Sequence, residues 1–338
     1  MKWGLHHAAG AAPSPRNSGG ASWLDSPPPQ VAVEIATDGI VAARLRPGQG
    51  SSSPETVAAR PLPPGAVLPG LTETNVADAG SLVAALRQSL EAVGGAGREA
   101  ALLLPDLAVR VALLEFEELP HHAEELDALV RFRLRKTLPF DAEQAALAVQ
   151  VMRSGLRRRV VAVTASRERL NEYEDAFAAA GGRAAQVLPA GLAALMARAE
   201  LGHGTLLLRW RSGALTSGFG WEQLPRLFRV IPTADGLVYD DLHASAAFFR
   251  DFLDNLPPQE RIVAPRILTF GIPEPVVAEL QRECDWARVS TGASAWGGAE
   301  SHLAVAGALQ PDTTEGAMGA QPASAGQVEG AAGTGASA

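Results

Sequence analysis

The chain has 338 residues, of which 47% are hydrophobic, and carries a formal net charge of −8. This acidic balance argues against a nucleic-acid scaffold. A single cysteine, Cys284, excludes an intramolecular disulfide framework and a cysteine-rich metal site. The sequence contains no apolar run of membrane-spanning length and no continuous apolar segment typical of a signal peptide. We therefore expect a cytoplasmic protein with two ordinary domains or one bilobal unit.

The first 29 residues are rich in Gly, Ala, Pro and Ser, which predicts a disordered leader. The ordered fold is expected to begin with a strand hairpin at Val31–Leu45, where valine and isoleucine alternate with small or polar residues. Its turn is predicted at Thr37, Asp38 and Gly39. We expect Gly39 to supply the positive φ angle that many hairpin turns need, and Asp38 to tolerate left-handed geometry.

Helical spacing, alternation and turn residues predict the remaining elements in chain order. The first half gives a surface connection at 47–70, a helix at 81–93 with Ser81 as a possible N-cap, strands at 101–104 and 109–116, a helix after Pro120, and a hairpin at 146–164. The second half gives helices at 166–180, 189–200, 237–255, 274–284 and 302–309, and strands at 184–187, 205–211, 214–219, 226–232 and 266–270. This order indicates an α/β or α+β bilobal architecture rather than a repeat array or a bundle.

Three separated segments together resemble one family, the type IV pilus assembly protein PilM, which has an actin-like ATPase fold. They are the hairpin at Val31–Leu45, residues 102–151 with a Pro-Phe-Asp turn after a helix, and residues 160–197 with a strand, a helix, a Gly pair, a strand and a second helix. The order and spacing of the three are more specific than any one of them. The related type II secretion L protein is a weaker resemblance of the same kind.

The resemblance implies a bilobal actin-like (ribonuclease H-like) α/β fold with an inserted α/β subdomain in the first lobe and a shortened second lobe. The expected divisions are a leader at 1–29, a first lobe at 30–200 with the insert at about 101–165, a reduced second lobe with the final helix at 201–310, and a disordered tail at 311–338.

The expected first phosphate loop departs from the pattern of the family. That pattern reads Asp, an apolar residue, Gly, three small hydroxyl residues and a Val-Lys pair. Here the acid is the longer Glu34, the first glycine is replaced by Ala36, the three hydroxyl positions hold Thr37, Asp38 and Gly39, and the lysine is lost. Asp38 adds a carboxylate that would face the phosphates of a nucleotide, which is electrostatically unfavourable.

The other expected nucleotide loops are equally reduced. The second phosphate loop holds Arg209 where the family has an acid for Mg²⁺, and the adenosine-side loop is reduced to Gly271. Only about thirty residues stand where the family has an additional lid subdomain. Since Mg-nucleotide binding needs carboxylate ligands and backbone N–H cradles, we expect no catalytic residue and no ATP or Mg²⁺ cofactor.

The resemblance also implies a partner. Members of the family bind the short cytoplasmic N-terminal peptide of PilN, a membrane protein of the pilus platform, and connect that platform to motor ATPases. We therefore expect a non-catalytic adaptor at the cytoplasmic face of the inner membrane, held there through partners. Leu138, Pro139 and Phe140 are weighed as part of the peptide groove against a simple chain turn. The alternative function is an active or nucleotide-binding actin-like ATPase or phosphotransferase.

Overall fold

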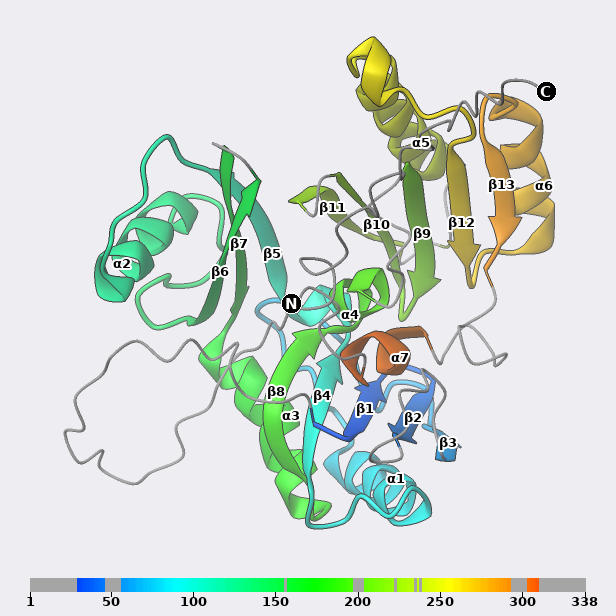
Figure 1. The fold of residues 1–338 in the computed structure, drawn as a ribbon. Helices are drawn as coiled ribbons and strands as arrows, with labels where there is room; N and C mark the ends of the chain where they lie inside the picture. Colours follow the sequence, from blue (N-terminus) through cyan, green and yellow to red (C-terminus); the bar gives the residue numbers. More distant parts are fainter. Residues whose placement is uncertain are drawn as a thin grey trace, which may run out of the picture.

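The computed structural model describes residues 29–45, 56–154, 157–196, 204–221, 224–233, 236, 239–292 and 303–309. The predicted tail and all but the last residue of the predicted leader lie outside these ranges. Two five-stranded sheets and one three-stranded sheet, each with its helices, form the described fold (Figure 1). None of the described helices has the length and apolar character needed to cross a bilayer.

The sheet of the first lobe combines an antiparallel ribbon with a parallel half. Its strands, in spatial order, are β3 (Thr56–Pro61), β2 (Gly39–Arg44), β1 (Val31–Ile35), β4 (Glu99–Leu104) and β8 (Arg183–Pro189). The pairs β3–β2 and β2–β1 are antiparallel, and β1–β4 and β4–β8 are parallel. The helices that pack on this sheet are α1 (Ala79–Ala92), α3 (Arg167–Ala179), α4 (Ala190–Met196) and α7 (Leu303–Leu309).

The second lobe repeats the same plan of strands. Its sheet has the order β11 (Leu224–Pro232), β10 (Ala214–Trp221), β9 (Thr205–Arg211), β12 (Arg266–Phe270) and β13 (Arg288–Thr291). The first two pairs are again antiparallel and the last two parallel. Between β11 and β12 the described elements are helix α5 (Tyr239–Asp254) and a 3₁₀ turn at Pro258–Glu260, and α6 (Glu274–Glu283) precedes β13. The two lobes are thus related by topology, although no internal repeat is evident in the sequence.

The inserted subdomain has a sheet of its own, in the order β5 (Arg110–Glu115), β7 (Arg157–Ala165) and β6 (Ala146–Ser154). Helix α2 (Ala123–Leu134) packs on it through a separate small core that contains Val130, Leu134 and Val160. Strand β4 pairs with β1 in the first-lobe sheet, so the sheet of the insert begins at Arg110. The strands predicted at 101–104 and 109–116 therefore belong to two different sheets.

The bilobal α/β architecture is confirmed, and several local predictions are corrected. Strand β3 lies inside the segment predicted as a surface connection. The prediction missed it because a short, half-exposed edge strand lacks a continuous apolar pattern. The N-cap of α1 is Asp78, whose carboxylate accepts a hydrogen bond from the Ser81 N–H at 3.0 Å. Helix α7, predicted as part of the second lobe, packs against α4 and against β1 and β2. Its Val305 is buried in the core of the first lobe.

Gly39 is required for a reason other than the predicted one. Its φ angle is not positive, in contrast to Gly213 in the turn between β9 and β10. A Cβ atom on Gly39 would lie 2.5 Å from the carbonyl oxygen of Arg60 and 3.3 Å from the Cα of Pro61. The missing side chain therefore allows β3 to approach β2 closely.

We expect Gly39→Ala to lower the free energy of unfolding by about 1–3 kcal/mol, because the added methyl group meets backbone atoms that cannot turn away. Gly80→Ala is the matched control, since its Cβ would meet only the Asp78 carboxylate at an ordinary 3.5 Å in the first turn of α1. That control should stabilise the protein by roughly 0.4–1 kcal/mol. Urea unfolding of the two variants measures both values, and an unchanged stability for Gly39→Ala would contradict the close-approach explanation.

Candidate functional site

The tips of two hairpins meet between the lobes, one from β1–β2 and the other from β9–β10. The backbone N–H of Thr37 donates a hydrogen bond to Ser212 Oγ at 3.2 Å. Arg211 holds the carboxylate of Asp38 with two nitrogens, at 3.1 and 3.2 Å. These are the segments expected to be the two phosphate loops, and in this structure they bind each other.

The geometry of the second hairpin explains how Ser212 reaches the first. Arg211 pairs with Ala214, which leaves Ser212 and Gly213 as a two-residue turn. Both residues have positive φ angles, 53° and 71°, as in the tight turns that match the twist of antiparallel strands. Positive φ is uncommon for a serine, and here it accompanies the contact with Thr37 across the lobes.

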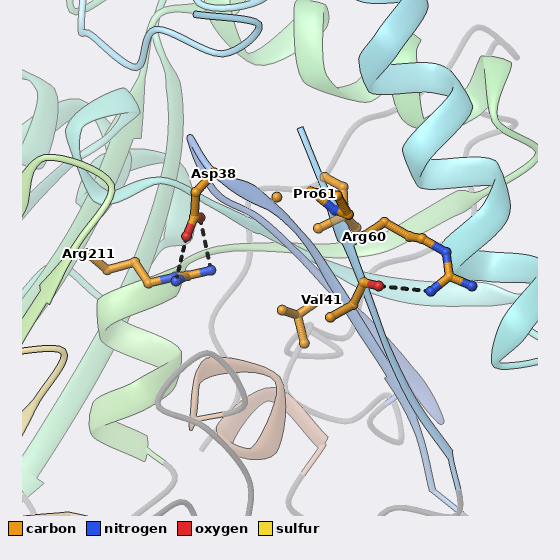
Figure 2. A pocket seen from close by; sticks show the side chains of 8 residues that line it. Asp38, Val41, Arg60, Pro61 and Arg211 are labelled. Carbon is orange, nitrogen blue, oxygen red and sulfur yellow. Dashed lines mark hydrogen bonds and ion pairs between the residues drawn. The ribbon is translucent and has the colours of Figure 1, made fainter. Parts of the chain in front are cut away.

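A shallow pocket of about 250 Å³ lies beside this contact and is lined by residues of β2, β3 and the hairpin tips. Figure 2 shows Arg211 reaching the Asp38 carboxylate on one side, while the Arg60 guanidinium turns toward the carbonyl of Ala59 on the other. Arg211, one of the two arginines that line this pocket, is therefore already paired with a carboxylate. Its guanidinium is thus not available to a phosphate at the first hairpin.

Behind the hairpin tips, Arg209 of β9 pairs with Glu34 of β1. Arg209 Nη2 lies 2.5 Å from Glu34 Oε1, and the side chains are only 2% and 1% exposed. Arg211 adds a second guanidinium, with its Nε 3.7 Å from the same Glu34 oxygen. The strand period places these groups, because Leu206 and Leu208 enter the core of the second lobe while Leu207, Arg209 and Arg211 share the opposite face.

Asp106 completes the buried site. It follows β4 directly, in the 3₁₀ turn η2 (Asp106–Ala108), and its Oδ2 lies 3.9 Å from Arg209 Nη1. Its two oxygens accept hydrogen bonds from the Gly191 N–H at 2.7 Å and from the Thr216 hydroxyl at 2.6 Å. Burial raises the pKa of Asp106, and the charge of Arg209 with these two hydrogen bonds opposes that rise.

We call Glu34, Asp106, Arg209 and Thr216 the interlobe cluster. Glu34 and Asp106 come from the first lobe, and Arg209 and Thr216 from the second. Gly191 permits the arrangement, because a Cβ atom there would lie 2.4 Å from Asp106 Oδ2. The sequence had drawn attention to Glu34 and Arg209 but not to Asp106, which lies between the strands predicted at 101–104 and 109–116. Its position at the carboxyl end of a buried parallel strand, where ligand-binding groups gather in α/β proteins, was the available signal.

The residues of this site do not fit a magnesium nucleotide. The two buried carboxylates face a guanidinium at the position expected for the second phosphate loop. The Thr37 N–H, a potential phosphate donor, is directed to Ser212. Gly271, the expected adenosine-side glycine, is exposed in the turn between β12 and α6 with φ of 68°. Among the described residues no three His, Cys, Asp or Glu side chains are grouped to hold a metal ion.

A larger cavity of about 640 Å³, which we call the interlobe groove, lies between the insert and the second lobe. Its lining is mainly apolar and comes from residues 69–72, η2 with the start of β5, Pro139, and β11. β5 and β11 are edge strands of their sheets, and Figure 1 shows them facing each other. Of the three predicted partner-binding residues, Pro139 lines this groove, Leu138 packs on the core of the insert, and Phe140 is half-buried.

No family model matches the sequence, and no curated protein does. Among solved structures, the chain is similar to that of the PilM-PilN type IV pilus biogenesis complex, with a TM-score of 0.63 and 18% identity over 82% of this chain and 96% of that one. It is also similar to the cytoplasmic domain of EpsL, an inner-membrane component of the type II secretion system of Vibrio cholerae, with a TM-score of 0.49 and 16% identity over 82% and 94% of the chains. The protein has the bilobal actin-like fold of the PilM structure.

We expect Arg209→Met to lower the free energy of unfolding by about 3–5 kcal/mol, because it leaves two buried carboxylates without their central cation. Arg250→Met, which removes an exposed partner of Asp254 and a contact with the Trp286 ring, should cost less than about 1 kcal/mol. Denaturant unfolding at neutral pH compares the two. Combining Arg209→Met with Glu34→Gln should cost less than the sum of the single changes, and full additivity would show that the pair is not coupled.

Proposed function

We propose that this chain is a non-catalytic adaptor that binds an extended peptide in the interlobe groove. The partner is the cytoplasmic N-terminal segment of a PilN-like membrane protein. Through that partner the chain sits at the cytoplasmic face of the inner membrane, in a type IV pilus or related secretion platform. Motor ATPases of the same machine are its further partners.

The observation that carries the peptide proposal is the position of the groove between two edge strands. β5 and β11 each present one edge that no strand of the same sheet covers. An extended peptide can pair its backbone with such an edge, while alternate side chains enter apolar pockets. Val111 of β5 and Phe228 and Val230 of β11 supply such an apolar lining. The groove therefore combines main-chain affinity with side-chain selection.

The choice of partner is supported by the fold. The solved PilM structure, which has the same fold over 96% of its length, is that of a complex with PilN. The non-catalytic part of the proposal is supported by the interlobe cluster. A guanidinium between Glu34 and Asp106 repels a metal cation, and the Asp38 carboxylate at the hairpin tip repels phosphates.

The partner interaction can be tested by titrating the protein with a synthetic N-terminal peptide of the PilN-like protein from the same organism. We expect a Kd of about tens of micromolar or tighter. Val230→Glu, which puts a charge into the apolar lining, should weaken binding at least about tenfold. Val263→Glu makes the same change at a fully exposed valine outside the groove lining and should leave the Kd unchanged. Failure of the unsubstituted protein to bind would refute the partner assignment.

The non-catalytic part is tested by thermal unfolding with millimolar Mg-ATP. A ligand at about one hundred times its Kd stabilises a folded protein by about 2.7 kcal/mol, which shifts the melting temperature by several degrees. We expect no shift and no phosphate release. A shift of several degrees, abolished by Glu34→Gln, would support nucleotide binding instead.

A further inference from the structure

We infer that the interlobe cluster sets the width of the groove, so that the buried Arg209 side chain keeps the peptide site formed without a nucleotide. This inference rests on the proposed function for the role of the groove as a peptide site, but the width of the groove can be measured without the peptide. Arg209 and Asp106 are in this sense positioning residues for the peptide.

The walls of the groove belong to different lobes. Leu71, Val109 and Val111 come from the first lobe and its insert, whereas Phe228 and Val230 come from β11 of the second lobe. A rotation of one lobe against the other therefore changes the separation of the walls. Hinge motion of two packed lobes is a common way of opening and closing a ligand site.

Asp106 takes part in both the groove and the interlobe cluster. It lines the groove, and it also binds Arg209 and Thr216 within the interlobe cluster. Along the chain, Asp106 begins the 3₁₀ turn that leads into Val109, Arg110 and β5, which form one wall. A shift of Asp106 would therefore move a wall residue and its neighbours.

The cluster is also connected to the opposite wall of the groove, through Thr216. Thr216 of β10 donates its hydroxyl hydrogen bond to Asp106 at 2.6 Å, and in the β10–β11 ladder Thr216 pairs with Val230. Val230 lines the groove. One hydrogen bond and one strand pairing thus join the two walls, and the charge of Arg209 holds the carboxylate at the centre of this connection.

A hydrogen bond that ties the insert to β11 lies away from the lining residues of the groove. Arg159 of β7 hydrogen-bonds to the carbonyl of Pro225 and pairs with Glu115, so the insert is tied to β11 near the end of β5. The lining residues of the groove lie at the other ends of these strands, around Arg110 and Val230. Without the cluster, we expect the strands to separate at that end while the Arg159 contact remains.

The test measures the groove directly, with spin labels on Arg110→Cys and Arg229→Cys, two exposed positions on opposite walls. The native Cys284 is buried, and a protein without the new cysteines checks that it stays unlabelled. Pulsed electron spin resonance should give one narrow distance in the doubly labelled protein that keeps Arg209, which we call the parent. Arg209→Met should give a longer and broader distribution, whereas Arg250→Met, at an exposed arginine whose partners lie in its own lobe, should leave it close to the parent.

Peptide affinity is measured with the same substitutions in the protein without the new cysteines and labels. We expect Arg209→Met to weaken binding at least about tenfold, Arg209→Lys to retain most of it, and Arg250→Met to change it little. Thr216→Val keeps the side-chain shape and removes only the hydrogen bond to Asp106. It tests the same connection if Arg209→Met does not fold, and it should broaden the distance distribution in the same direction.

The two proposals fail in different ways. An unchanged distance distribution in folded Arg209→Met and Thr216→Val would overturn the role of the cluster, even if the unsubstituted protein binds the peptide. Absence of peptide binding by the unsubstituted protein would overturn the proposed function, while the distances would still decide whether the cluster sets the width. A wider groove with unchanged peptide affinity would overturn the positioning role.

Discussion

The structure depends on the burial of one arginine between two carboxylates where its lobes meet. Each of these charges would be costly to bury alone, because transfer out of water removes its hydration. Arg209, Glu34 and Asp106 offset that cost for one another, and the Gly191 N–H and the Thr216 hydroxyl satisfy the oxygens of Asp106. Such a group defines a particular arrangement of the lobes, since the favourable contacts exist only when both lobes present their charges together.

The position of this arginine also supports the proposed non-catalytic function. In a nucleotide-binding relative of this architecture, facing hairpins would enclose phosphates and a metal ion. Here the hairpins bind each other through Thr37 and Ser212, and a permanent side-chain cation stands against the carboxylates. In the proposed function, this side-chain cation takes the place of the charge that a bound metal would bring. The proposed peptide groove lies next to this centre and shares Asp106 with it.

Much of the fold could be read from the sequence, and the errors have physical causes. Strand β12 at Arg266–Phe270 and the hairpin of β6 and β7 were predictable from their apolar residues and turns. Strand β3 was missed because its edge position gives it a half-exposed, weakly apolar pattern. Gly39 was singled out for the wrong reason, since its φ angle is not positive. A glycine is needed there because the backbone of Arg60 leaves no room for a Cβ atom.

The sequence by itself determined the α/β class, the order of the elements and the loss of the expected phosphate-loop residues, because these follow from local periodicity and residue type. Only the tertiary structure decided that Arg209 enters a buried pair with Glu34, that Asp106 joins it, and that α7 returns to the first lobe. Those facts depend on contacts between residues far apart in the sequence, and Arg209 and Glu34, for example, are 175 positions apart. Strand alternation fixes the side of a sheet on which a residue lies, but the partner across the interface is fixed only when the two lobes pack.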